Sequence, residues 1–237
     1  MKRLLYIGLL CCIGVTVVSC DKKAEGVFTD DTTEEYQLYD YYIDEYGNEG
    51  IVAYIYTLTT LKKYIIVLSV DEAYESWGPM GEIVYKDTVS KSGIEDPSFG
   101  VAMHQAMTSI GIERFPAQAW CNQKNADEPH PRGGSWRLPS YYEYKQIFGT
   151  DGNKVPNLNK ALSGVNGTLI SSDQQYWTCV EDITDYWSFS ESDNDYDQAN
   201  RAVTILPNLK AYTLKDRWLK KIKHNVRAIK YVYYQYN

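Results

Sequence analysis

The sequence predicts an α+β domain with short antiparallel strands, two or three helices and long loops. Two runs of β-branched and aromatic residues, at 51–57 and 63–70, indicate a hairpin. The apolar segment 99–110, preceded by Asp-Pro-Ser, is typical of a helix. Four more strand-like runs follow, separated by turn regions rich in Gly, Asn, Asp and Ser: 175–180, 186–190, 201–206 and 225–234. Three shorter elements complete the prediction: a strand at 82–86 and helices at 115–123 and 157–163.

Residues 136–148 combine a short extended segment with a helix start. Pro139 keeps the residue before it out of the helical region. Ser140 and Glu143 have the spacing of a capping box, in which each side chain satisfies a free backbone amide at the start of a helix. The apolar residues of the next turns share one face, and Gly149 is placed to end the helix.

The first 19 residues have the pattern of a secretory signal peptide: two basic residues, an apolar run over 4–18, and small residues at the end. The ending V-V-S-C resembles a bacterial lipobox, which implies cleavage before Cys20 and attachment of acyl chains such as palmitate to that cysteine. An ordinary signal peptide with a chance cysteine is the alternative. No other stretch is long and apolar enough to span a bilayer. We therefore expect a lipid-anchored protein of the bacterial cell envelope, at the outer membrane or cell surface.

The mature chain divides into an acidic, lipidated tether at 20–48 and a domain at 49–237. The tether is rich in tyrosine, which disordered chains usually lack, so part of it is expected to lie along the domain. Residues 1–19 hold two of the 24 basic residues and none of the 31 acidic ones, which leaves the mature chain at −9 (22 against 31). This charge argues against a nucleic-acid partner.

Two cysteines, Cys121 and Cys179, remain in the mature chain besides Cys20. In an exported protein they can pair as a disulfide, and two free buried thiols are the alternative.

Three segments, in this order, resemble the motifs of a known family: a WRLPxxxE segment, a YW…E segment and a closing VRAI strand. The matching residues are Trp136, Arg137, Leu138, Pro139 and Glu143, then Tyr176, Trp177 and Glu181, then Val226, Arg227, Ala228 and Ile229. The pattern is similar to that of the C-terminal domain of the Legionella collagen-like adhesin and of the major paralogous domain of bacterial lipoproteins. The residues at 178–180 depart from the family's Ser-Ser-Thr.

The resemblance covers roughly residues 47–234 and implies a C-type-lectin-like fold, shared with formylglycine-generating enzymes. Physical reasoning gives Arg137 a structural role, because a buried guanidinium needs a carboxylate partner. We expect that partner to be Glu181, in a bidentate pair beneath Trp136 and Trp177 that staples the loop-rich half of the domain.

No catalytic site is predicted, so the protein is not expected to be an enzyme. A formylglycine-type oxidase needs reactive cysteines near the end of its domain, whereas the closing strand here has Ala228, and no cysteine follows Cys179. His104, His130 and His224 have no metal-ligand spacing.

No cofactor is predicted, with calcium kept as a minor alternative. Glu128-Pro129-His130 is similar to a fragment of a lectin calcium loop, but the partner Trp-Asn-Asp is absent. The alternating carboxylates over 193–197 lack the glycine and glutamate of an EF-hand loop.

The segment 210–230 holds eight basic residues and a single acid, against the net charge of the chain. If they lie on one face, these residues would bind an anionic polysaccharide. The alternative is that the segment is a solvated loop and strand edge with no ligand. The candidates are Lys215, Arg217, Lys220, Lys221 and Lys223. Exposed aromatics would instead bind sugars without calcium, and core packing is the alternative for each: Tyr186, Trp187, Tyr196, Tyr212 and Trp218.

The sequence therefore predicts a non-enzymatic binding or adhesion module of the cell envelope, with polysaccharide or another envelope protein as partner. The alternatives are a structural subunit of a surface assembly, such as a fimbrial tip, and, less favoured, an enzyme on a lectin-like scaffold.

Overall fold

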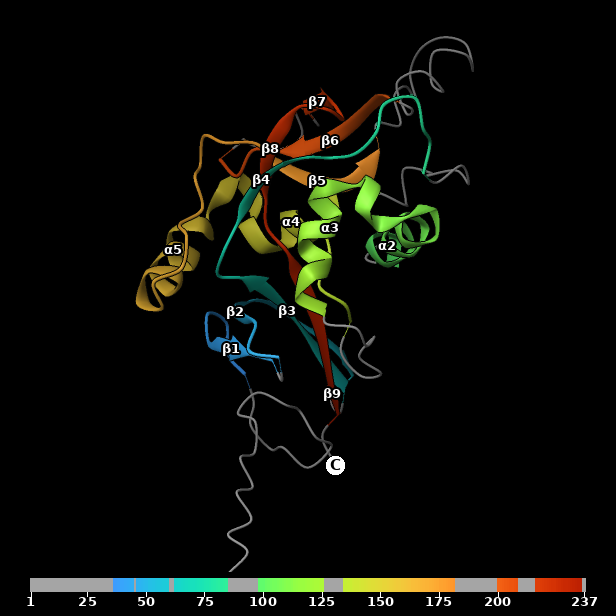
Figure 1. Ribbon diagram of the computed structural model, residues 1–237. Helices are drawn as coiled ribbons and strands as arrows, with labels where there is room; N and C mark the ends of the chain where they lie inside the picture. The colour runs from blue at the N-terminus through green and yellow to red at the C-terminus, as the bar shows by residue number, and fades with distance from the viewer. Residues whose placement is uncertain are drawn as a thin grey trace, which may run out of the picture.

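The computed structural model describes residues 36–44, 46–59, 62–84, 98–125, 134–181, 200–208 and 216–235. The predicted signal peptide, Cys20 and the first part of the tether lie outside these residues, as does the strand predicted at 186–190. The architecture is α+β, with two β-sheets and helices packed against them (Figure 1). No described helix is long and apolar enough to cross a bilayer.

The first sheet is antiparallel and has the order β1-β2-β3-β9. Its strands are β1 (Tyr41–Ile43), β2 (Glu49–Thr59), β3 (Lys62–Ser69) and β9 (Ile229–Gln235). The predicted hairpin is confirmed as β2 and β3. Both faces of this hairpin are covered, because Val52 and Val67 belong to one core cluster and Ile51 and Leu68 to the other. Burial on both faces explains the nearly continuous apolar runs in the sequence.

The second sheet has the order β4-β8-β5-β6-β7. Its strands are β4 (Ala73–Ser76), β8 (Lys223–Val226), β5 (Tyr176–Glu181), β6 (Arg201–Ile205) and β7 (Asp216–Leu219). All neighbours are antiparallel except β5 and β8, which are parallel.

The two sheets are joined by two bent chain segments, β3–β4 and β8–β9. The chain passes from β3 to β4 after Ser69 and returns from β8 to β9 through Arg227 and Ala228, so each segment contributes one strand to each sheet. The single strand predicted at 225–234 is therefore wrong: it is two strands with a bend between them. The bend is held from inside, because the Arg227 guanidinium donates to the carbonyls of Ser69 and Thr168 and to the carboxylate of Glu72.

The strand predicted at 82–86 is also absent over 82–84, the part that the structure describes. Side chains take up its backbone groups: Lys220 Nζ donates to the Glu82 carbonyl, and Glu181 accepts from the Val84 amide. Three of the described strands are not predicted by the sequence: β1, β4 and β7.

Four α-helices pack on the sheets in the described part of the chain: α2 (Ser98–Ile110), α3 (Pro116–Asn122), α4 (Tyr141–Phe148) and α5 (Val155–Gly164). Each corresponds to a segment that the sequence predicts as helical, although the predicted fold class has only two or three helices. Figure 1 shows α2 and α3 on one side of the molecule and α5 on the other. The first core cluster includes residues of α2 and α3, and the second includes residues of α4 and α5.

The capping box of α4 is confirmed. Ser140 accepts from the Glu143 amide, and the Glu143 carboxylate accepts from the Ser140 amide at 2.6 Å. Gly149 ends the helix with a φ of 76°, a conformation that glycine adopts at little cost.

Candidate functional site

The three motif segments of the sequence lie side by side. Arg137 exchanges two backbone hydrogen bonds with Ile229, of 3.0 and 2.9 Å, and the Cys179 amide donates to the Pro139 carbonyl at 2.8 Å. Trp136 and Trp177 are both fully buried in the first core cluster. The WRLP segment is thus a structural junction between the closing strand and β5.

The carboxylate partner of Arg137 is Glu143, so the predicted pair with Glu181 is wrong. Arg137 Nη1 and Nη2 lie 2.8 and 2.5 Å from the two Glu143 oxygens, and both side chains are buried. Tyr231 also donates its hydroxyl to Glu143. The helix start explains the choice: the capping box already turns Glu143 back toward the extended segment, which brings it to Arg137.

This pair is buried, with Arg137 2% exposed and Glu143 without exposed surface. A Cβ atom on Gly100 of α2 would lie 2.3 Å from Arg137 Nη1. Burial alone would raise the pKa of Glu143, but Arg137 and the hydrogen bonds from Tyr231 and Ser140 lower it below its usual range. The pair holds the fold, and its atoms are not open to a ligand.

Glu181 pairs with Lys220 instead. Lys220 Nζ lies 2.5 Å from Glu181 Oε1 and 4.7 Å from the centre of the Trp77 ring. The Val84 amide donates to both Glu181 oxygens, at 3.0 and 3.1 Å. Burial lowers the pKa of Lys220, an effect that Glu181 opposes. Because Lys220 has no exposed surface, its predicted role in polyanion binding is wrong.

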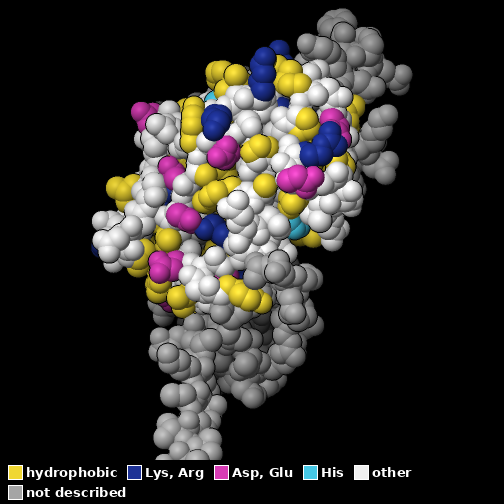
Figure 2. Space-filling model, in the orientation of Figure 1, with side chains coloured by type: hydrophobic (Ala, Val, Ile, Leu, Met, Phe, Trp, Pro, Cys, Tyr) yellow, Lys and Arg dark blue, Asp and Glu magenta, His cyan; other side chains and the backbone are white. Residues whose placement is uncertain are grey.

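The basic segment does not form one exposed face. Arg227 and Lys230 are buried and lie beside Glu72 and Asp44, at 2.7 and 3.4 Å. Lys221 and Lys223 are exposed, and Lys223 lies 3.3 Å from Glu75. Lys215 and the side chain of Arg217 lie outside the described residues. Figure 2 shows basic and acidic side chains interspersed on one face of the molecule.

Asp44 is a buried residue whose role the sequence did not indicate. It lies at the end of β1, in the segment assigned to the tether, and β1 pairs with β2, as the tyrosines of the tether predict. Its carboxylate accepts from the Trp136 indole at 2.8 Å and from Asn48, near Lys230. Burial would raise the pKa of Asp44, but these donors and Lys230 outweigh it and lower the pKa.

The Asp44→Asn substitution is expected to make the free energy of unfolding depend less on pH below pH 7. A carboxylate with a lowered pKa adds stability above its unfolded pKa of about 4, which is lost as the pH falls through the lower folded value. The variant should therefore be less stable than wild type at pH 7, and the difference should shrink toward pH 2. Urea unfolding of the full chain at both pH values measures this. Asp173→Asn, at an exposed position, is the control, and a difference that is constant with pH would contradict the prediction.

Cys121 on α3 and Cys179 on β5 are free and buried, which is the second of the two alternatives. Burial raises the pKa of both thiols well above the usual value, so they are poor nucleophiles. In the mature chain with Cys20 lipidated, iodoacetamide should leave both unmodified in the folded state and alkylate both after denaturation without reductant. Intact mass measures the two added groups. A denatured chain that reacts only after reduction would instead show a disulfide.

His104 also has a structural role. Its Nδ1 lies 3.0 Å from Gln118 Nε2, and the Gln118 carbonyl oxygen accepts from the Leu138 amide. Burial, with a smaller contribution from Arg137, lowers the pKa of His104 to about 4. His130 lies outside the described residues.

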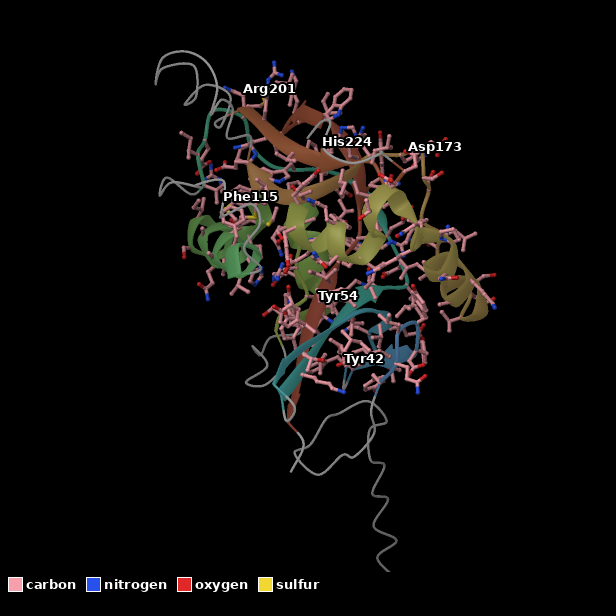
Figure 3. All side chains as sticks on the ribbon, turned by 180° about the vertical axis from the view of Figure 1, so that it is seen from behind. Tyr42, Tyr54, Phe115, Asp173, Arg201 and His224 are labelled. Carbon is pink, nitrogen blue, oxygen red and sulfur yellow. The ribbon has the colours of Figure 1, made fainter. Side chains whose placement is uncertain are left out.

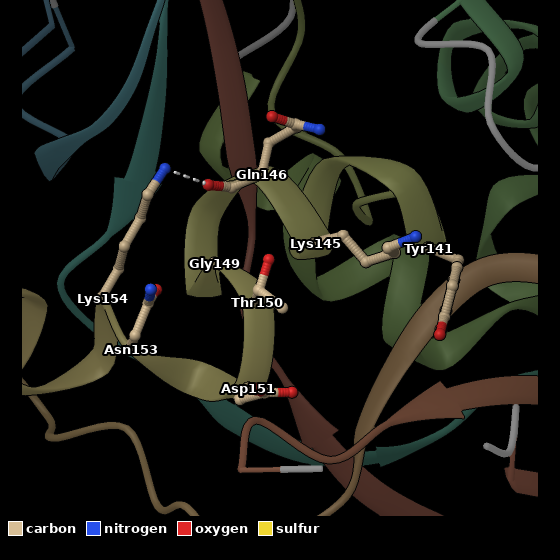
Figure 4. Close-up of a pocket in the computed structure, with 8 residues that line it drawn as sticks. All are labelled: Tyr141, Lys145, Gln146, Gly149, Thr150, Asp151, Asn153 and Lys154. Atoms are coloured by element: carbon tan, nitrogen blue, oxygen red, sulfur yellow. Dashed lines mark hydrogen bonds between the residues drawn. The ribbon is translucent and has the colours of Figure 1, made fainter. Parts of the chain in front are cut away.

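One hollow, of about 290 Å³, lies at the corner between α4 and α5. Figure 4 shows Lys154 and Lys145 on opposite sides of Thr150. Lys154 Nζ donates to the Gln146 carbonyl at 2.8 Å and lies 4.9 Å from the centre of the Tyr54 ring. Lys154 therefore caps the carboxyl end of α4, where a cation is favourable.

A larger hollow, of about 510 Å³, lies where β4, β8 and the start of β5 meet; we name it the β4–β8 hollow. The residues that line it are Tyr74, Gln174, Gln175, His224 and Asn225. Tyr74 is 59% exposed, more than any other large apolar or aromatic side chain that the structure describes. Sequence patterns do not indicate this site, because its residues come from three separate segments and Tyr74 lies on β4, a strand that the sequence does not predict.

Of the aromatic residues predicted to bind sugars, Trp218 lies on β7 and is 41% exposed. The other four, and the residues considered for calcium at 128–130 and 193–197, lie outside the described part of the chain. Within the described ranges, no group of three or more His, Cys, Asp or Glu side chains is placed to hold a metal ion.

The fold and this hollow define a two-sheet α+β protein with a polar surface site. No family model and no curated protein matches the chain. The chain is similar in fold to a fimbrial protein from Bacteroides ovatus, with 13% identity and a TM-score of 0.50. The match covers 70% of this chain and 35% of the fimbrial protein, so this chain corresponds to about a third of that protein's length.

Proposed function

We propose that the protein is a lipid-anchored component of the bacterial cell envelope whose folded domain is a non-enzymatic binding module for adhesion. The observation that carries this proposal is the β4–β8 hollow, an open surface site with polar side chains where β4, β8 and the turn before β5 meet. Its lining residues include three with side-chain amides and one with a phenol ring, and none of them carries a carboxylate. Such groups recognise a ligand by hydrogen bonds and ring contacts.

The buried charged groups support binding over catalysis, because their partners lie within the fold. Arg137 pairs with Glu143, Lys220 with Glu181, and Arg227 with Glu72. A catalytic acid or base must reach its substrate. The lectin-like fold belongs to the same proposal, and the hydrogen bonds that join the three motif segments support it.

The anchoring is tested by labelling cells with a fatty-acid analogue. The wild-type chain should carry the label and fractionate with membranes, whereas Cys20→Ser should lose the label. Label retained by Cys20→Ser would contradict lipid attachment at this residue.

The binding function is tested with the full chain on an array of neutral and anionic glycans, at low and physiological salt. Binding to any glycan, together with adhesion of cells that display the protein, is the expected result. No binding on the array and no change in adhesion would contradict the binding function.

The likeness to a fimbrial protein favours a second candidate, a subunit of a surface assembly. This candidate predicts that chemical crosslinking on intact cells joins the chain to other envelope proteins in a fixed stoichiometry. A chain that remains uncrosslinked would contradict it.

A further inference from the structure

We propose that the β4–β8 hollow binds a neutral sugar unit of a glycan, without calcium. This inference rests on the proposed binding function and names the ligand class of its site. The alternative ligand, an anionic polysaccharide on the basic segment, is less well supported, because Lys220, Arg227 and Lys230 of that segment are buried.

One wall of the hollow is an exposed aromatic ring. Tyr74 lies opposite Asn225 in the antiparallel ladder of β4 and β8. Directly opposed residues of a ladder place their side chains on the same face of the sheet, so the phenol ring and the Asn225 amide lie together. An exposed ring with a polar group beside it offers both an apolar face and a hydroxyl.

The amides of the hollow are held in place. Asn225 is 5% exposed, and its Nδ2 donates to Gln174 Oε1 at 2.8 Å. Its backbone amide donates to the Gln175 carbonyl at 3.0 Å. The first bond uses one lone pair of the Gln174 oxygen and orients its NH₂ group. The NH₂ group can donate to a sugar hydroxyl, and the second lone pair of the oxygen can accept from one.

His224 precedes Asn225 on β8, so its side chain lies on the opposite face of the sheet, where two aromatic neighbours contact it. The His224 ring centre lies 4.8 Å from that of Trp177 and 5.0 Å from that of Trp218. Trp177 is fully buried and donates its indole hydrogen to the Glu75 carbonyl, which ties it to β4. Figure 3 shows His224 on the second sheet, far from Tyr42 and Tyr54 on the first. These contacts hold the β8 wall of the hollow in place, which limits the entropy that this wall loses on binding.

The charge of the hollow indicates a neutral ligand. Its lining has no Lys, Arg, Asp or Glu side chain. The nearest charged side chains along β4 and β8, Glu75 and Lys223, lie 3.3 Å apart and offset each other. Its volume of about 510 Å³ falls within the range of small-ligand sites. The hollow between α4 and α5 has a volume of about 290 Å³. The Lys154 amine there already donates to the Gln146 carbonyl.

The test uses the full chain, purified in a detergent without a sugar headgroup, on an array of neutral glycans, anionic glycans and peptides. We expect binding to neutral glycans that persists at high salt and after chelation of calcium. Tyr74→Ala and Gln174→Ala should each weaken it about tenfold, because each removes a ligand contact. Tyr41→Ala is the matched control, since Tyr41 is also exposed, at 43%, but lies on β1 in the other sheet.

Unchanged thermal unfolding midpoints in the two variants show that the fold is retained. Neutral-glycan binding that survives both substitutions would overturn the site but leave the proposed binding function intact. Binding only to anionic glycans, only to peptides, or only with calcium would overturn the ligand class. No binding to any probe would overturn both this inference and the proposed function.

Discussion

Lys220→Ala is expected to lower the free energy of unfolding by about 3–5 kcal/mol, the usual cost of leaving one member of a buried ion pair without its partner. Glu181 would keep its negative charge in a site with almost no exposed surface and would lose the ammonium group that lies 2.5 Å from it. The Glu82 carbonyl would lose a donor as well. Urea unfolding of the full chain, followed by tryptophan fluorescence, measures the change.

The neighbouring residue gives a matched control. Lys221 is exposed, so Lys221→Ala should change the free energy of unfolding by at most about 0.5 kcal/mol. Lys220→Glu should be more harmful than Lys220→Ala, because it places a second carboxylate beside Glu181. Equal effects at positions 220 and 221 would show that Lys220 is not buried in an ion pair.

Arg137→Ala is expected to cost about 3–5 kcal/mol for the same physical reason, since Glu143 would be left charged and buried. Glu143 also caps α4, so the loss of its partner should weaken the helix start. The measurement is again the free energy of unfolding of the full chain in urea.

Two further variants identify the cause of this loss. Arg114→Ala removes an exposed pair, with Glu82, and should cost about 0–1 kcal/mol. Adding Glu143→Gln to Arg137→Ala removes the stranded charge while keeping a capping side chain, and should restore part of the stability. A double variant less stable than Arg137→Ala would contradict the assignment of the cost to an unpaired carboxylate.

Local elements were predictable because their signals lie within a few residues. The helix α4 is the clearest case, since Ser140, Glu143 and Gly149 each have one role that depends on their immediate neighbours. The β2–β3 hairpin was equally clear, because its two apolar runs are close in sequence.

The strand predictions failed where side chains from distant parts of the sequence bind the backbone carbonyl and amide groups. The strand predicted over 82–86 was plausible by composition, but the carbonyl of Glu82 and the amide of Val84 bind Lys220 and Glu181. The break between β8 and β9 depends on the contacts of Arg227 with Ser69, Glu72 and Thr168. None of these partners is near in sequence.

The sequence by itself determined the helices, the hairpin, the order of the three motif segments and the need of Arg137 for a carboxylate. Only the tertiary structure decided which carboxylate it binds, which lysines are buried, and that Tyr74 meets Gln174 and Asn225 at one hollow. The physical reason is the distance along the sequence over which each interaction acts. Backbone preferences and capping act over a few residues, whereas ion pairing and burial depend on distances that the chain closes only when it folds.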